Sequence, residues 1–219
     1  MEKSLALKIK RVFDFIFSLL VLIIISPVLI VLAIGAWLSL GLPIFFLQPR
    51  AGYYGRVFNL IKFRSMTNER GPEGELLPNE ERLTAFGKFI RSTSLDELPQ
   101  FINVLLGDLS VVGPRPLPVR YLEIYNERQA LRHNVRPGIT GWSQVGFRGE
   151  RRTWEERLEQ DVWYVENWSL GLDLKIIVLT FWVLLLRILY RRERQANAFE
   201  EFIGETMNDA AKTKKIRKN

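Results

Sequence analysis

The chain has 219 residues, of which 47% are hydrophobic and 25% charged, with a formal net charge of +7 and no cysteine. This length supports one sizeable core, or a modest core and a membrane segment. The lack of cysteine excludes disulfides and thiolate chemistry, and the single histidine, His133, leaves little scope for a His-rich metal site. The net positive charge fits a protein that binds phosphorylated substrates, anionic lipid or nucleic acid, and charge alone does not choose among them.

The first long feature is an apolar run. Residues 15–49 contain no charged side chain over 35 residues, more than the roughly 20 needed for one membrane-crossing helix and too few for two. Ser26 and Pro27 interrupt the run, because proline removes a helical hydrogen bond. The serine hydroxyl can satisfy the backbone group that is freed. The arm at residues 15–25 reaches only about 16 Å as a helix and cannot cross alone.

Basic side chains flank both ends of this run. They are Lys8, Lys10 and Arg11 before it and Arg50, Arg56, Lys62 and Arg64 after it. Because cytoplasmic flanks attract Lys and Arg, we expect both ends on the same side of the membrane. We therefore interpret residues 1–48 as a re-entrant anchor, a helix that enters the bilayer, breaks at Ser26-Pro27 and returns. A kinked single-pass helix and a cleaved signal peptide are the alternatives.

Two β-prone runs follow, at residues 44–47 and 57–63, and the glycines and tyrosines between them predict a hairpin. Strand side chains alternate, so Lys62 and Arg64 would share one face, and two cations on one face suit a phosphate. A solvated basic face is the alternative. The polar segment at residues 68–81 predicts a loop.

Two adjacent acids, Asp96 and Glu97, follow a short helix that Thr84 is expected to cap. They precede Leu98-Pro99, and proline favours the first position of a helix, so the acids are expected at a helix start. The amides and partial positive charge there would keep a carboxylate ionised and attract phosphate. Alternatively, Ser94 and Glu97 form a capping box with no further role. The helix after Pro99 is expected to end at Gly107.

Arg115 stands between two prolines, which fix the backbone and display the side chain at little entropic cost. A guanidinium presented in this way is a good bidentate phosphate ligand. A simple proline-rich turn is the alternative. Further on, Pro137-Gly138 predicts a type II turn.

Thr153 and Glu156 predict a capping box that opens an amphipathic helix. Asp161 falls on the apolar side of that helix, where an unpaired carboxylate would be costly, so we expect a cationic, metal or hydrogen-bonding partner. A site role and a structural ion pair both stay open for Asp161.

Residues 176–186 are apolar but too few to cross a bilayer. Basic residues flank them, which favours a helix lying in the membrane interface over a buried core helix. Residues 191–219 are polar and charged, and we expect a tail that contacts anionic lipid.

Four motifs, taken in order after the Ser-Pro-broken helix, resemble the bacterial sugar transferase family. They are Lys62-Phe-Arg-Ser-Met-Thr67, Arg91-Ser-Thr-Ser-Leu-Asp-Glu-Leu-Pro-Gln100, Gly107-Asp-Leu-Ser-Val-Val-Gly-Pro-Arg-Pro116 and Arg136-Pro-Gly-Ile-Thr-Gly-Trp142. The resemblance is to the small form of the monotopic polyprenyl-phosphate phosphoglycosyl transferases, and it extends over about residues 8–190.

This resemblance implies transfer of a sugar 1-phosphate from a UDP-sugar to polyprenyl (undecaprenyl) phosphate, with release of UMP. It implies Mg²⁺ and a place on the cytoplasmic face of the bacterial inner membrane, at the first membrane step of glycoconjugate assembly. Asp96 matches the nucleophile of a ping-pong mechanism and is also the expected metal ligand, and Glu97 matches its partner. The basic residues expected near the bound phosphates are Lys62, Arg91 and Arg115, and those given a weaker substrate-binding role are Arg64, Arg136 and Asp161.

The expected fold is α+β and mostly helical, with a small β-hairpin and interfacial amphipathic helices around a compact catalytic domain. The predicted divisions are the anchor at residues 1–48, the catalytic domain at 49–190 and the tail at 191–219. Expected partners are the two substrates and membrane lipids, without nucleic acid. Two rival functions are a membrane-tethered polyanion-binding protein and a metal-dependent lipid pyrophosphate phosphatase. The sugar and the oligomeric state stay open, with a homo-oligomer among the options.

Overall fold

The computed structural model describes residues 2–146 and 153–190. These residues form two compact units, one made of residues 2–48 and 59–111 and the other of residues 49–58, 112–146 and 153–190. Both units are mostly helical with short strands, which confirms the predicted fold class in outline. The division between anchor and catalytic domain at residue 48 stays a prediction, and the predicted tail at residues 191–219 lies outside the described residues.

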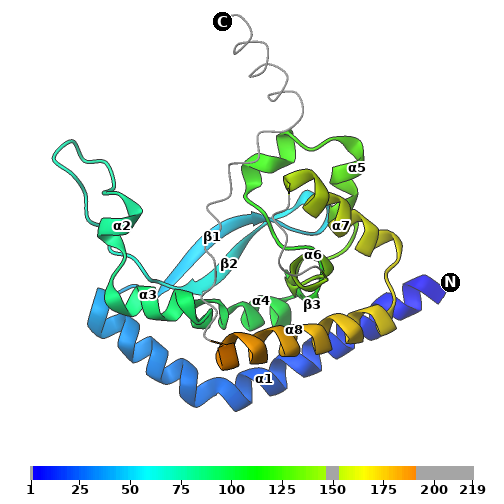
Figure 1. Ribbon diagram of the computed structural model, residues 1–219, viewed down its shortest axis with the longest axis horizontal. Coiled ribbons are helices and arrows are strands. Elements are labelled where there is room, and N and C mark those ends of the chain that lie inside the picture. The colour runs from blue at the N-terminus through cyan, green and yellow to red at the C-terminus, as the bar shows by residue number, and fades with distance from the viewer. Residues whose placement is uncertain (1, 147–152, 191–219) are drawn as a thin grey trace, which may run out of the picture. The chain divides into compact units, whose positions relative to one another are not determined.

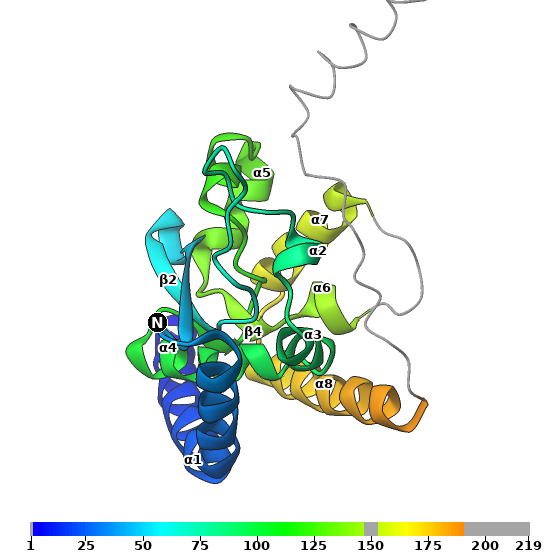
Figure 2. The ribbon, with the colours of Figure 1, turned by 90° about the vertical axis from the view of Figure 1, so that its left-hand side faces the viewer.

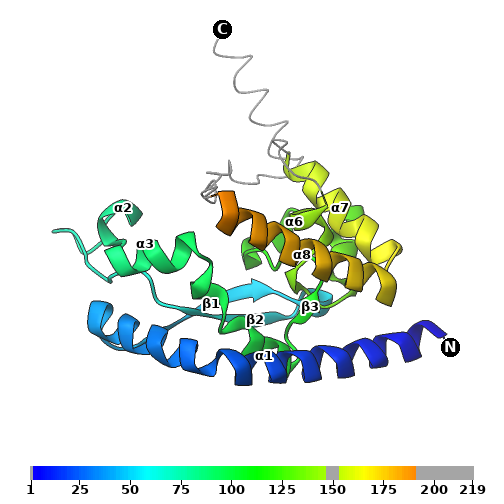
Figure 3. The ribbon, with the colours of Figure 1, turned by 60° about the horizontal axis from the view of Figure 1, so that its bottom comes forward.

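The first unit begins with one long helix, α1 (Glu2–Leu40). The expectation of a helix interrupted at Ser26-Pro27 is wrong in this respect, because α1 continues through Pro27. The helix bends near its middle instead, as Figure 1 shows, and Figure 3 shows the same helix as a shallower curve.

Hydrogen bonding next to Pro27 explains why α1 stays helical there. Pro27 has no N–H, so the carbonyl of Ile23, four residues earlier, loses its normal helical donor. The hydroxyl of Ser26 donates to that carbonyl at 2.8 Å, as the sequence predicts. The freed group is satisfied within the helix, and the backbone bends without breaking.

The predicted hairpin is confirmed and its first strand is longer than expected. Strands β1 (Phe45–Ala51) and β2 (Val57–Phe63) pair with each other around a short 3₁₀ turn, Tyr53–Gly55. Both strands run from one unit into the other.

Helices α3 (Ala85–Ser92) and α4 (Gln100–Leu106) both contact α1, and they lie on the concave side of its bend (Figure 1). Thr84 caps α3 by accepting a hydrogen bond from Gly87 N–H at 3.0 Å, as predicted. The polar segment before it ends in the short helix α2 (Asn79–Arg82). Gly107 ends α4 in the left-handed conformation that glycine favours, with φ of 93°.

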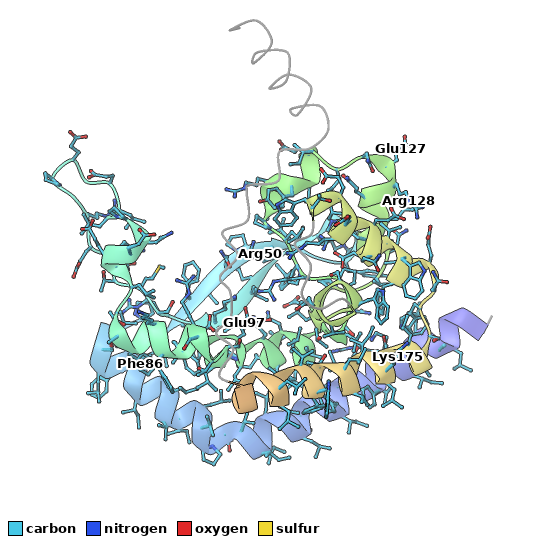
Figure 4. The ribbon with its side chains drawn as sticks, in the orientation of Figure 1. Arg50, Phe86, Glu97, Glu127, Arg128 and Lys175 are labelled. Atoms are coloured by element: carbon cyan, nitrogen blue, oxygen red, sulfur yellow. The ribbon has the colours of Figure 1, made fainter. Side chains whose placement is uncertain are left out.

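The core of the first unit joins the anchor helix to the strand and helix that follow it. Leu32 and Ala36 of α1 pack with Phe63 of β2 and Ile90 of α3. Phe86 of α3 lies against the same end of α1 (Figure 4), where a Cβ added to Gly35 would stand 2.6 Å from its ring. Glycine is therefore required at position 35 for α3 to approach α1 this closely.

The second unit contains short helices and two long ones. Its elements are α5 (Glu127–Ala130), β4 (Gly138–Thr140), α6 (Trp142–Val145), α7 (Trp154–Glu166) and α8 (Leu170–Tyr190). The short strand β3 (Ser110–Val112) pairs with β4. The predicted capping box at Thr153 and Glu156 is present at the start of α7.

The type II turn predicted at Pro137-Gly138 is wrong. Gly138 begins β4 and does not occupy the left-handed position that such a turn requires. Glycine is needed for another reason, since a Cβ at this position would overlap the backbone nitrogen of Gly113. The two backbones therefore approach each other closely, and Gly138 N–H donates to the carbonyl of Pro114 at 2.9 Å.

Helix α8 has one packed side and one exposed apolar side. Asp173 and Ile176 are buried, and α6 and α7 lie on one side of the helix (Figures 2 and 3). The exposed apolar side chains include Leu174, Val178, Phe181, Trp182 and Leu185. A core helix buried on all sides, the alternative considered from the sequence, is therefore wrong.

Candidate active site

The central contact of the candidate site is an ion pair between Lys62 and Glu97. Lys62 Nζ lies 2.9 Å from Glu97 Oε1, and the two side chains are only 16% and 14% exposed. Lys62 comes from β2, and Glu97 lies just before α4, where it is labelled in Figure 4. The structure therefore brings together two residues that the sequence assigns to the site from different motifs.

Asp96 and Glu97 belong to a 3₁₀ turn, Leu95–Glu97, that precedes α4. Asp96 is buried, with 6% of its surface exposed. The residue before this turn, Ser94, adopts the left-handed conformation with φ of 61°, which is uncommon for a non-glycine residue. Its side chain makes no capping bond, so the capping-box alternative is wrong, and the acids lie one turn before α4 instead of inside it.

Apolar side chains on either side of the acids fix this turn to the anchor helix. Leu95 and Leu98 pack against the cluster that contains Leu32 and Ala36 of α1. The position of the acidic pair is therefore set by the anchor as well as by the strand and helix of its own unit.

The other basic residues of the first unit have different surroundings. Arg91 is exposed in the last turn of α3. Arg64 is buried and donates to the carbonyl oxygens of Leu40, Gly41 and Leu42, which lie at the end of α1. The basic face shared by Lys62 and Arg64 that strand alternation predicted stays a prediction. A role for Arg64 in substrate binding stays a prediction.

In the second unit, Asp161 has the partners that its position on the helix predicted. It is buried and pairs with Arg132 at 2.6 Å, while Ser143 donates to its other oxygen at 2.6 Å. This arrangement favours the structural ion pair over a substrate-binding role. Burial and the Asp161 charge act in opposite directions on the pKa of Arg132, and the net result is a raised pKa.

Arg132 also holds the backbone of the proline-flanked loop. Its Nη2 donates to the carbonyl of Arg115 at 2.7 Å, so the main chain at Arg115 is fixed by a buried guanidinium. Sequence reasoning missed Arg132 and Ser143. No local pattern marks them, because Arg132 is 29 positions from its ionic partner.

Arg136 lies over the ring of Tyr53, with its guanidinium carbon 5.2 Å from the ring centroid. Such cation–π contacts stabilise a side chain and also leave the edge of the guanidinium available for hydrogen bonds. Arg115, Arg136 and Asp161 all belong to the second unit, and Lys62, Arg91 and the acidic pair belong to the first.

The described residues contain no group of three or more acidic or histidine side chains that could hold a metal ion by themselves. Mg²⁺ usually keeps several waters and is bound through one or two carboxylates and the phosphates of a substrate. The carboxylate of Asp96, next to the Lys62–Glu97 pair, fits that second kind of site.

The sequence model of the bacterial sugar transferase family matches residues 5–187. The chain belongs to the bacterial sugar transferase family. The match includes α1, the hairpin, the acidic turn and most of α8, so nearly all of the described chain is family sequence.

Three curated relatives differ in how much of their own length this chain matches. An uncharacterized sugar transferase of Bacillus subtilis, EpsL, is 52% identical over 78% of this chain and 85% of its own length. A UDP-glucose:undecaprenyl-phosphate glucose-1-phosphate transferase of Klebsiella pneumoniae is 48% identical over 78% of this chain but only 39% of its own length. An undecaprenyl-phosphate galactose phosphotransferase of Salmonella typhimurium is 40% identical, and the match spans 41% of its length. The chain thus spans less than half of the length of these last two relatives.

Proposed function

We propose that this protein transfers a sugar 1-phosphate from a UDP-sugar to undecaprenyl phosphate, giving undecaprenyl diphospho-sugar and UMP. Family membership and the names of the relatives support the reaction class. The observation that carries the proposal is the ion pair of Lys62 with Glu97 beside the buried Asp96. The relatives are named for glucose and for galactose, so they leave the sugar open.

The proposed reaction has two steps on one carboxylate. An oxygen of Asp96 attacks the sugar-bearing phosphorus, the bond from that phosphorus to the bridging oxygen breaks, and UMP leaves. The product is an aspartyl phospho-sugar. An oxygen of undecaprenyl phosphate then attacks the same phosphorus, and the Asp96 carboxylate is released. Each step exchanges one bond at phosphorus for another, so the carboxylate is regenerated.

Lys62 and Glu97 support this chemistry by charge and orientation. Phosphoryl transfer depends on positioning and on stabilising charge that spreads over the equatorial oxygens. The ammonium of Lys62 supplies positive charge next to the acids, and Glu97 orients it. Arg91 is a further cation of the same unit that would bind the phosphates of the donor, and the family resemblance implies the same role for Arg115. Mg²⁺, held by Asp96 and the substrate phosphates, would neutralise part of the diphosphate charge.

The membrane anchor is part of the same proposal. Among residues 2–146 and 153–190, one helix, Leu5–Leu40, is long and apolar enough to cross a membrane. Its 36 residues would extend about 54 Å if straight, well beyond the ~30 Å hydrocarbon core. A bent helix of this length, with Pro27 inside it, therefore favours a re-entrant path, with both ends on the cytoplasmic face. This path would bring the acids to the surface where a soluble donor and a lipid acceptor meet.

The test is a UMP-release assay on the purified full-length protein in detergent, with a panel of UDP-sugars and undecaprenyl phosphate. We expect release of UMP with at least one donor. Asp96→Asn should abolish it, because an amide is a poor nucleophile, while Glu159→Gln on the exposed surface of α7 should leave it unchanged. With donor alone, intact mass should show the bound phospho-sugar. Free phosphate in place of UMP would indicate a phosphatase and overturn the proposal.

A further inference from the structure

Asn103 is a polar residue in the middle of α4, and its environment is unusual for a helix that is otherwise mostly apolar. It is 1% exposed. Its amide oxygen accepts the N–H of Ile61 at 3.0 Å, and its amide nitrogen donates to the carbonyl of Asn59 at 2.8 Å. The second hydrogen of that nitrogen is directed to a carboxylate oxygen of Asp108 at 3.2 Å. Burying an amide is costly unless it is bonded in this way.

These contacts give β2 a substitute for a neighbouring strand. β2 pairs with β1 along one edge, and its other edge needs partners for its N–H and C=O groups. The carbonyl of one residue and the N–H two residues later point to the same side of a strand. One residue of an adjacent parallel strand would bond both groups, and the Asn103 side chain takes its place.

The backbone carbonyl of Asn103 is also hydrogen-bonded. Its carbonyl accepts hydrogen bonds from the N–H groups of Gly107, Asp108 and Leu109 at 3.1, 3.0 and 3.2 Å. These bonds close the end of α4, where Gly107 takes the left-handed conformation. Asn103 is thus held rigidly in the helix while its side chain holds the strand.

The two elements that Asn103 joins are those that carry the central ion pair. Ile61 is directly followed by Lys62, and Glu97 is separated from α4 by only two residues. The Lys62–Glu97 distance of 2.9 Å therefore depends on the register between β2 and α4. We propose that Asn103 is a positioning residue that sets this register and so places Lys62 against Glu97. This inference rests on the proposed function.

The test is a double-mutant cycle on the full-length protein with Asn103→Ala and Lys62→Ala, measured as steady-state UMP release. Misplacement by about 1 Å can cost on the order of 100-fold in rate, so Asn103→Ala alone should lower kcat by about 10- to 100-fold, with a smaller change in the donor KM. On the Lys62→Ala background, Asn103→Ala should have almost no further effect, because the group that it positions is already gone.

A matched control separates positioning from stability. Asn126→Ala also removes an asparagine whose side chain bonds backbone, at the start of α5 in the second unit. We expect both alanine variants to lower the midpoint of thermal unfolding, and only Asn103→Ala to lower kcat per folded enzyme. If Asn103→Ala does not fold, the double variant Asn103→Asp/Asp108→Asn keeps an acceptor for Ile61 and removes the donor to Asn59. This double variant should then lower kcat as Asn103→Ala does, but by a smaller factor.

The outcome that would overturn the proposed function differs from the outcomes that would overturn the positioning role. A wild-type protein that releases no UMP with any donor would overturn the proposed function. An active wild type in which the Asn103→Ala and Lys62→Ala losses multiply would overturn the positioning role alone. So would an Asn103→Ala variant with the kcat of the wild type.

Discussion

Asp96 and Glu97 are neighbours in sequence with different surroundings, and this difference supports different roles. Glu97 is bound to the ammonium of Lys62, and Asp96 is more deeply buried in the 3₁₀ turn. Two carboxylates in unlike environments are a common way to divide catalytic work between a nucleophile and an orienting group. In the proposed reaction Asp96 attacks phosphorus, and Glu97 orients Lys62.

A second residue with unusual surroundings is His133, in the second unit. It is buried, and its Nδ1 donates to the carbonyl of Gly52 at 3.0 Å, which ties the turn of the hairpin to the 3₁₀ segment Leu131–Asn134. Burial, with the nearby charge of Arg132, lowers the pKa of His133 to about 4; the Gly52 carbonyl opposes this shift. The imidazole is therefore neutral in the folded protein at neutral pH.

We predict that this histidine makes the protein less stable in mild acid. Because the unfolded chain binds the proton with a pKa near 6.5, stability is full above that value and falls as the pH drops towards 4, by up to about 3 kcal/mol. The measurement is the midpoint of thermal unfolding in detergent from pH 7.5 to 4.5. His133→Asn, which does not titrate, should show a smaller decline than the wild type. Parallel profiles would contradict the prediction.

Residue-scale predictions from the sequence succeed where the signal is local. The acidic pair and Lys62 were found because each stands in a short motif. Asn103 and Arg132 were not, because their partners lie 42 and 29 positions away and only the folded chain brings them together. Asp161 was an intermediate case, since helical periodicity showed that it needed a partner but not which one.

At the scale of elements, local capping rules were reliable and backbone strain was not foreseen. Thr84 and Thr153 cap their helices as their sequences predict. Ser94 has the same kind of pattern but adopts a left-handed conformation, so its side chain is not placed to cap. The sequence predicted a break at Ser26-Pro27, but α1 accommodates the proline through Ser26 and continues.

We predict that Pro27 determines which side of the membrane the N-terminus occupies. Pro27→Ala restores a donor for the Ile23 carbonyl, so α1 should straighten towards a spanning helix. Because the chain has no cysteine, single cysteines at Ser4 and Asn68 can be labelled with an impermeant maleimide. In the wild type both should react only from the cytoplasmic side. In Pro27→Ala the cysteine at position 4 should react from the opposite side.

Val28→Ala is the matched control for that experiment, since it keeps the proline and should leave the labelling pattern unchanged. Reaction of the position 4 cysteine from the outer side in the wild-type background would contradict the re-entrant path. It would favour a single kinked crossing.

At the scale of the whole molecule, the described part of the chain has two apolar surfaces of the kind that membranes cover. One is α1, and the other is the exposed side of α8, where Leu174, Val178 and Phe181 follow helical spacing. A helix with this pattern is expected to lie in the bilayer interface. The sequence predicted such a helix at residues 176–186, and in the structure it is longer, Leu170–Tyr190, with Ser169 Oγ accepting the N–H of Leu172 in its first turn.

We predict that the exposed side of α8 contacts lipid. A fluorescent label on a cysteine at Phe181 should be quenched by nitroxide lipids in proteoliposomes, because this side chain is 62% exposed on the apolar side. A label at Glu159, on the exposed surface of α7, should not be quenched. Equal quenching at both positions, or at neither, would be inconsistent with an interfacial α8.

The packing of Leu32 and Ala36 against Phe63 and Ile90 has a practical consequence for anyone who wants a water-soluble version of this protein. Deleting the first forty residues would do more than detach the protein from the membrane. It would remove one side of the hydrophobic interior and the side chains on which the turn with the two acids packs. A usable soluble variant has to retain the second half of that helix and redesign only its outward-facing side chains.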